Sequence, residues 1–287
     1  MLLVHPHLSY NHAMKVQDCC LACLKGLAEK TVRLSGGNDA LIKNCFHLID
    51  SLWHPEITPP AISNVVLKYI KSETGADDPY DTAKIKEFNE AVSVIDELRD
   101  RFESSIEGLI KLSALGNSAD FFTQGRYNVR NFVFTGNVAQ IENEIYIRSK
   151  DILILGDNVG DFIFDMPLVD HLEGKGKRVY YAVREKPVQN DLSLKDVREF
   201  GLDKIFARIV STGDDEVGVT KEHMSGPVKA FWESGATVIA KGMGNFETIS
   251  EFHNDRPVVY IMRVKCPAVA FVTGRNQGAY MASIGGE

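Results

Sequence analysis

The segment that decides the fold is DILILGDNVGDFIFD, residues 151–165. Its first five residues form a short apolar run that is typical of a strand buried in a parallel sheet. The run leads directly into Asp157, Asn158 and Asp161, which are costly to desolvate unless something binds them. The segment therefore predicts a buried strand that carries acids and an amide to a functional site.

Further short β-prone runs follow along the second half of the chain, separated mostly by helix-sized segments. They cover residues 178–183, 206–210, 236–240, 258–262 and 268–272. This alternation predicts an α/β fold class, a doubly wound and mostly parallel sheet with helices on both faces. The connection RVKCP (263–267) is too short for a helical crossover, so we expect the last strand to pair antiparallel with its predecessor.

The first half of the chain is helix-rich. In ITPPAISNVVLKYIKSETG, Thr58 is a predicted N-cap, prolines occupy the first turn and Gly75 ends the helix. A second helix is predicted over about 81–105, because its apolar residues fall along one stripe.

With 287 residues, the chain exceeds the usual size of a single core. We predict an N-terminal helical domain over 1–125 and an α/β domain, which binds metal and phosphate, over 151–287. Residues 125–150 are treated as a transition.

The composition excludes several classes of protein. It is 44% hydrophobic and 25% charged, as in ordinary globular proteins, and no apolar run approaches the roughly 18–20 residues of a membrane span. The net charge of −7 gives no basic footprint for nucleic acid. The first residues do not read as a secretory signal, so a cytoplasmic protein that binds neither nucleic acid nor membrane is expected.

The five cysteines are an odd number, which argues against a disulfide framework. Cys20 and Cys23 form a CxxC motif just before a helical stretch. The motif is compatible with a redox pair, with half of a metal site, or with small core residues one helical turn apart. A redox pair would lose activity on oxidation and recover it with reductant.

Polar, glycine-bearing segments follow five of the predicted strands. The carboxyl ends of parallel strands meet at one edge of the sheet, near the point where the strand order reverses. Carboxylates and an amide oxygen suit a hard divalent cation, whereas lysine and glycine-loop amides suit phosphate oxygens. Together these segments predict a metal and a phosphate in one cleft.

Each motif also has a purely structural interpretation. Asp157 can cap the next helix, Lys265 can extend along a strand end to solvent, and GMGN (242–245) can be a tight turn with Asn245 as a cap. As a dinucleotide fingerprint, GMGN lacks the third glycine, because Glu247 stands there.

The carboxyl-terminal half resembles the metal-dependent damage-control phosphatases. The matching segments are GDNVGDFIFD against the family's DNxGE pattern, VREKPVQND against R-x-x-P-x-x-N-D, VIAKGMGNFETI against KGxxNxE, and MRVKC against the distal lysine motif. Upstream, TGADDPYDTAKIKEFN and LSALGNSADF resemble the DPY-x-x-x-K and GN-x-x-D stretches. The CxxC of Cys20 and Cys23 resembles the motif of the stand-alone subfamily.

The resemblance implies roles for individual residues. Asp157, Asn158 and Asp191 would hold the catalytic metal, with Asn158 also touching substrate. Asp161 replaces the family's glutamate with a shorter reach, and it would orient or deprotonate the attacking water or support the metal ligands. The substrate's phosphate or sugar would contact Lys241, Gly242, Gly244, Asn245 and Lys265. From the helical half, Asn117 and Asp120 would close the cleft.

The implied activity is hydrolysis of phosphate monoesters of small, possibly damaged metabolites such as sugar phosphates or nucleotides. The implied cofactor is manganese, nickel, cobalt or magnesium rather than zinc. Two other functions stay open. A phosphometabolite-binding module would bind its ligand without metal, and a carboxylate methyltransferase would need an adenosylmethionine site, for which the usual glycine-rich turn is not evident.

Overall fold

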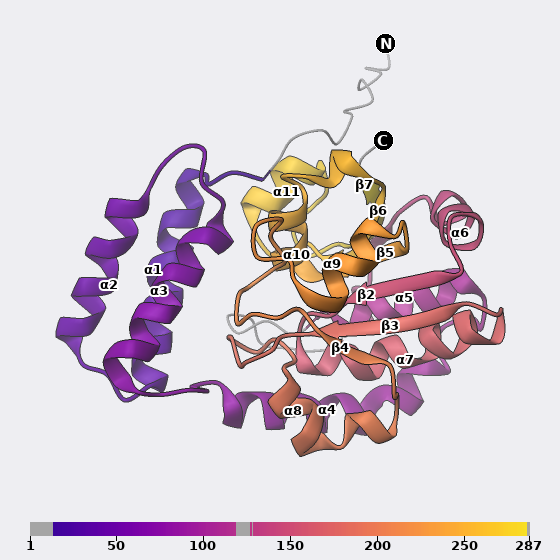
Figure 1. Cartoon of the computed structure of the whole chain (residues 1–287), viewed down its shortest axis with the longest axis horizontal. Helices are drawn as coiled ribbons and strands as arrows, with labels where there is room; N and C mark the ends of the chain where they lie inside the picture. The colour runs from indigo at the N-terminus through magenta and orange to yellow at the C-terminus, as the bar shows by residue number, and fades with distance from the viewer. Residues whose placement is uncertain (1–13, 119–126, 128, 286–287) are drawn as a thin grey trace, which may run out of the picture.

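The computed structural model describes residues 14–118, 127 and 129–285 and has a seven-stranded sheet at its centre (Figure 1). The strand order is β1-β7-β6-β5-β2-β3-β4. All neighbouring strands pair parallel except β6 and β7, which are antiparallel. The strands are Phe134–Thr135 (β1), Asp151–Leu155 (β2), Arg178–Val183 (β3), Ile209–Ser211 (β4), Thr237–Lys241 (β5), Val258–Arg263 (β6) and Tyr280–Gly285 (β7). The predicted α/β fold class is confirmed.

Helices α1 to α5 precede the first strand, and α6 to α11 lie between strands. They are Asp18–Leu34 (α1), Asp39–Leu52 (α2), Pro59–Thr74 (α3), Asp81–Arg99 (α4), Ile106–Gly116 (α5), Val138–Ile147 (α6), Val159–Gly174 (α7), Leu194–Phe200 (α8), Gly226–Glu233 (α9), Gly242–Ile249 (α10) and Pro267–Thr273 (α11). Short 3-10 turns follow α8 (Leu202–Lys204) and α10 (His253–Asp255).

The sheet is buried on both faces, because successive strand residues enter two different cores. Ile152 and Ile154 of β2 pack into a core shared with α4, α5 and α7. Leu153 and Leu155 pack into the opposite core, which contains residues of α9, α10 and α11. A strand buried in this way needs apolar residues at its buried positions, and Ile152 to Leu155 supply them after the partly exposed Asp151.

Helices α1, α2 and α3 pack on one another and stand beside the sheet (Figure 1). They enclose a third core of their own, which includes Leu24, Cys45 and Ile62. Helices α4 and α5 instead share the core of the sheet and pack against α7. The division into domains 1–125 and 151–287 stays a prediction.

The two helices predicted from the sequence, after Thr58 and from about residue 81, form largely as expected. The Thr58 side chain accepts a hydrogen bond from the Ala61 backbone N–H and begins α3, and Gly75 ends it in the left-handed region at φ 68°. Helix α4 begins at Asp81 but ends at Arg99, short of the predicted 105.

The strand predicted over 268–272 is wrong, because these residues form α11. Pro267 occupies the first turn, the Cys266 side chain accepts from the Val269 backbone N–H, and Gly274 ends the helix with φ 61°. A short apolar run does not distinguish strand from helix, and here the caps decide. The final strand is β7 instead. It pairs antiparallel with β6, but the chain reaches it through α11 rather than through the short link 263–267 on which the expectation rested.

Within the described part of the chain, no helix has both the length and the apolar character that crossing a bilayer requires.

A buried ion pair fastens α4 to α8. Lys84 Nζ lies 2.7 Å from Asp78 Oδ2 and 2.8 Å from Asp196 Oδ1, and the lysine side chain has no exposed surface. We expect Lys84→Met to lower the free energy of unfolding in urea by about 3–5 kcal/mol, because Asp196 stays buried without its cation and Asp78 keeps only Lys195, at 3.4 Å. The control Lys111→Met removes an exposed pair with Glu107 and should cost about 0.5 kcal/mol or less. Similar losses in both variants would contradict the assignment.

Candidate functional site

The loop after β2 brings Asp157 and Asn158 to the point where the strand order reverses. Strand β2 lies between β5 and β3, so the chain crosses to one side after β2 and to the other after β4. The Asp157 carbonyl accepts a 2.8 Å hydrogen bond from the Leu192 backbone N–H, and a β-bridge joins Asn158 to Asp191. Three of the predicted site residues are therefore held together by main-chain contacts.

Asn117, at the end of α5, holds two of the acids. Its Nδ2 donates to Asp157 Oδ2 and to Asp161 Oδ2, both at 2.8 Å, and its Oδ1 accepts from the Arg263 backbone N–H at 3.1 Å. Its side chain is fully buried. Asn117 therefore lies behind the acids and fixes them, rather than closing the cleft as expected. Asp120, its predicted companion, lies outside the described residues.

Asp191 is paired with a buried arginine. Arg184 Nε donates to Asp191 Oδ2 at 2.9 Å, and its Nη1 donates to the Gly218 carbonyl at 2.7 Å. Burial raises the pKa of Asp191 to about 7; the nearby charge of Arg184 opposes this rise and that of Asp157 adds to it. The pKa indicates that this pocket disfavours two neighbouring carboxylate charges.

Asn190 and Glu87 fix the amide of Asn158. Asn190 Nδ2 donates to Asn158 Oδ1 at 2.6 Å and to Glu87 Oε2 at 3.2 Å, while Glu87 Oε1 accepts from the Gly160 backbone N–H at 3.1 Å. Asn190 belongs to the N-D motif. Sequence reasoning missed Glu87, because an acid on an amphipathic helix reads as a solvated residue, and only tertiary packing buries it.

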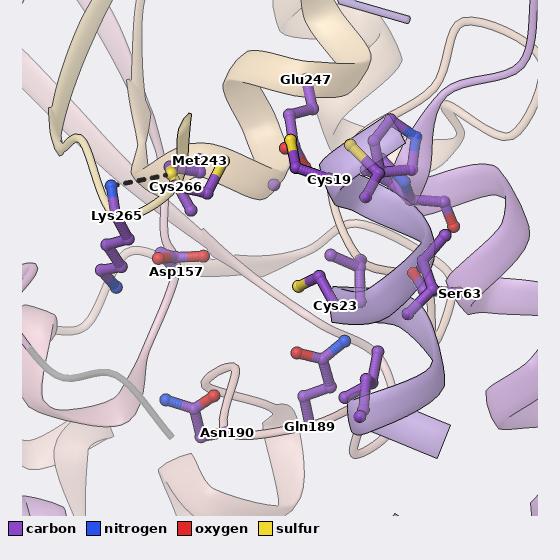
Figure 2. A pocket seen from close by; sticks show the side chains of 18 of the residues that line it. Cys19, Cys23, Ser63, Asp157, Gln189, Asn190, Met243, Glu247, Lys265 and Cys266 are labelled. Atoms are coloured by element: carbon purple, nitrogen blue, oxygen red, sulfur yellow. Dashed lines mark hydrogen bonds between the residues drawn. The ribbon is translucent and has the colours of Figure 1, made fainter. Parts of the chain in front are cut away.

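A cavity of about 520 Å³ opens in front of these residues, between the sheet and helix α1 (Figure 2). Of the predicted site residues, those that line it are Asp157, Asn158, Asp191, Gly244, Lys265 and Cys20 with Cys23. The volume falls in the range of small-molecule sites, roughly 300–1,000 Å³. One cavity therefore brings the predicted metal set and the distal lysine together.

Lys241 and Asn245 do not line this cavity, which corrects the role predicted for them. Lys241 Nζ donates to the Ser113 carbonyl at 2.7 Å and pairs with Asp165 at 2.8 Å, and its side chain is fully buried. Lys241 lies two residues after Ile239, on the same face of β5, which packs toward α5 and α7. Asn245 donates to the carbonyls of Leu155 and Lys241 and so joins β2 to β5.

The two glycines of GMGN allow close approach of main chain to side chain. At Gly242, whose φ is 75°, an added Cβ would lie 1.9 Å from Asp157 Oδ2. At Gly244, an added Cβ would lie 2.9 Å from Val217 Cγ1. Gly242 is therefore needed for the position of Asp157 rather than for a phosphate contact.

Asp161 lies behind the wall of the cavity, and its side chain is fully buried. Its carboxylate accepts the hydrogen bond from Asn117 described above, and Asn158 Nδ2 lies 3.5 Å from Asp161 Oδ1. Burial raises the pKa of Asp161 well above its usual range. The nearby charge of Lys241 opposes this rise, and that of Asp157 adds to it. This position suits a residue that orients Asn117 and Asn158, and it does not give the direct access to water that a general base needs.

The CxxC motif lies in the first turns of α1, and all five cysteines are free thiols. Figure 2 shows Cys23 pointing from α1 into the cavity. Cys20 is buried, and burial raises the pKa of its thiol to about 11, so little thiolate forms at neutral pH. This favours a packing role for Cys20, while the redox interpretation of the motif stays untested.

Glu247 is a cavity residue that sequence reasoning did not assign to the site. Burial raises the pKa of Glu247 to about 8, with a further rise from the charge of Asp157, so the side chain is mostly protonated at neutral pH. The family pattern KGxxNxE contains this glutamate and was the signal that could have found it.

The candidate metal set consists of two carboxylates and an amide. Among the described residues, no three aspartate, glutamate, histidine or cysteine side chains converge as a metal site. Within the same residues, Asp157 accepts from the amides of Asn117 and Asn158, not from a lysine or arginine. In the described part of the chain, the buried Asp157 carboxylate thus has hydrogen bonds but no ion-pair partner, an arrangement that a cation would stabilise.

The fold and the site define an α/β protein with an acidic cavity at the switch point of a doubly wound sheet. Residues 16–281 match the family described as the damage-control phosphatase ARMT1-like domain. The chain is 30% identical to damage-control phosphatase PH1575 of Pyrococcus horikoshii, over 90% of this chain and 93% of that protein. It is 23% identical to a damage-control phosphatase of Archaeoglobus fulgidus, over 94% and 99% of the two chains.

A solved structure is similar to the whole fold. The crystal structure of a DUF89 family protein from Pyrococcus horikoshii matches with a TM-score of 0.80 and 26% identity, over 93% of this chain and 98% of that one. The protein therefore belongs to the damage-control phosphatase family. Membership supports a phosphatase role in metabolite repair, and the resemblance drawn from the sequence is confirmed.

The close approach at Gly242 can be tested against a glycine with the same backbone conformation. Gly235 has φ 79° and open space around its Cα, so Gly235→Ala should cost about 1–2 kcal/mol of unfolding free energy from the left-handed conformation alone. Gly242→Ala adds a collision with Asp157 and should cost about 1–3 kcal/mol more in urea denaturation. Equal losses would show that Gly242 does not constrain Asp157.

Proposed function

We propose that the protein is a metal-dependent phosphatase that hydrolyses phosphate monoesters of small metabolites in this cavity. The observation that carries the proposal is the convergence of Asp157, Asn158, Asp191 and Lys265 on one cavity, in a chain of the damage-control phosphatase family. Hard oxygen donors beside a cationic side chain are what a divalent ion and a phosphoryl group together require.

The donor set fits a divalent cation. Asp157, Asn158 and Asp191 would hold it, and the Asn158 oxygen keeps one lone pair besides the bond from Asn190. Bound there, a divalent ion lowers the pKa of a water and neutralises charge on the phosphoryl group. Manganese, nickel, cobalt and magnesium all suit oxygen donors to some degree, and we propose one of them as the cofactor.

The residues around the set orient it. Asn117 holds Asp157 from behind the cavity wall, and Glu87 acts through the cavity residue Asn190 to hold Asn158, so both donors are fixed by hydrogen bonds. Lys265 supplies positive charge for the phosphate oxygens, and its charge lowers the pKa of Asp161. Asp161 acts as a positioning residue. Such preorganised groups reduce the reorganisation that the reaction would otherwise need.

The first experiment measures phosphate release from 4-nitrophenyl phosphate by EDTA-treated protein, with manganese, nickel, cobalt or magnesium added back singly. We expect activity to return with at least one metal and to fall by about 100-fold or more in Asp157→Asn, since the substitution removes a ligand charge. Asp170→Asn, an exposed acid on α7, is the matched control and should keep full activity. Folded protein that binds phosphate without metal and releases none would favour the binding module instead.

Metal binding should depend on pH through Asp191. Below its pKa of about 7 this carboxyl carries a proton that a cation must displace. The affinity for manganese should therefore weaken as the pH falls from 8 to 6, by up to about tenfold per pH unit below 7. Calorimetric titrations at pH 6, 7 and 8, in two buffers of different ionisation enthalpy, report the affinity and the protons released. An affinity that does not change with pH would contradict this role.

A further inference from the structure

The cavity has two walls of opposite chemistry. The wall from the sheet carries the acids, Lys265 and the amides of Gln189 and Asn190 (Figure 2). The wall from the helices is formed by Cys19, Cys20, Ala22, Cys23, Leu24, Gly26, Leu27, Pro59, Pro60 and Ser63. Within the described ranges, this helical wall contributes no charged side chain.

The few polar atoms of the helical wall are poor partners for a ligand's hydroxyl groups. Ser63 Oγ already donates to the Pro60 carbonyl at 2.9 Å, and thiols are weak hydrogen-bond donors and acceptors. The charged residues of α1 next to this wall, such as Lys25 with its partner Asp50, are not among those that line the cavity. A polyhydroxylated group against this wall would lose its hydrogen bonds to water and would meet mainly carbon and sulfur atoms, which replace those bonds poorly.

The sheet wall extends this apolar surface at its far end. Met243, Val217, Cys266 and Pro267 also line the cavity. Glu247 and Gln277 are further polar side chains that line the cavity, and neither lies on the helical wall. The cavity is also much larger than a phosphate group needs, which leaves room for a bulky leaving group against the helices.

We infer that the preferred substrate is a phosphate monoester whose alcohol is apolar, such as a cyclic or aromatic alcohol, rather than a sugar phosphate. The inference rests on the proposed function, because it places the phosphate at Asp157 and Lys265. Hydrolysis adds the oxygen of water to phosphorus, and the bond from phosphorus to the alcohol oxygen breaks. The alcohol oxygen keeps the electron pair and takes a proton, giving free alcohol and inorganic phosphate.

Two esters of one leaving-group type test the inference. Cyclohexylmethyl phosphate and glucose 6-phosphate are both primary alkyl esters on a six-membered ring, and they differ mainly in the ring oxygen and hydroxyls. We expect kcat/KM for the cyclohexyl ester to be higher by about tenfold or more, because its ring loses no hydrogen bonds with water. If turnover of either ester is too slow to measure, the inhibition constants of the two against 4-nitrophenyl phosphate hydrolysis are compared in the same way.

A pair of variants on α1 locates the preference. Leu27 lines the cavity and is partly exposed, so Leu27→Asn should reduce the ratio of the two kcat/KM values by about threefold or more. Leu34, on the same helix but 45% exposed and outside the cavity, gives the matched control Leu34→Asn, which should leave the ratio unchanged.

The possible results separate this inference from the proposed function. The inference would be overturned if glucose 6-phosphate were hydrolysed with a kcat/KM equal to or higher than that of cyclohexylmethyl phosphate, or if it inhibited equally well or better. The phosphatase function would still stand. A ratio that Leu27→Asn does not move would also overturn it. No phosphate release from either ester or from 4-nitrophenyl phosphate, with any of the four metals, would overturn both.

Discussion

Burial of carboxylates at the end of a central strand is the constraint on which the rest of this structure depends. Asp157, Asp161 and Asp191 lie almost out of contact with solvent, where each charge is costly unless it is bonded. Their partners come from distant segments: Asn117 from the end of α5 and Arg184 from just after β3. The helical half and the sheet must therefore assemble correctly before the acids can be buried at all.

The same constraint separates residues that hold the site from residues that face a ligand. Asn117, Asp161 and Glu87 are fully or almost fully buried behind the acids, whereas Asp157, Asn158 and Lys265 line the cavity. Lys241 belongs to neither group, since its ammonium pairs with Asp165 between β5 and α7. Much of the polar chemistry near the strand ends thus fixes geometry, as the surroundings of metal sites commonly do.

The sequence predicts the fold better than it predicts the buried residues that surround the site. The alternation of apolar runs and helix-sized segments, together with Asp157 and Asn158 after the first strand of that series, indicates the sheet and its switch point. The run 268–272 is wrongly predicted as a strand because its apolar residues fit a strand or a helix, and only Cys266, Pro267 and Gly274 at its ends indicate a helix. Lys241 is misassigned because its direction depends on strand register, and Glu87 is missed because only tertiary packing buries it.

The bundle of α1, α2 and α3 has its own hydrophobic core, yet it supplies one wall of the cavity. Leu24 on that wall belongs to the core of the bundle, whereas Cys20 packs into the core of the sheet beside Leu153 and Leu155. Substitutions at wall positions such as Leu24 are therefore separated from the sheet, and mutations at separated sites usually act additively. In evolution, the range of accepted ligands can drift through α1 and α3 while the chemistry on the sheet is preserved. The surface that would select the ligand and the surface that carries the acids thus rest largely on different hydrophobic cores.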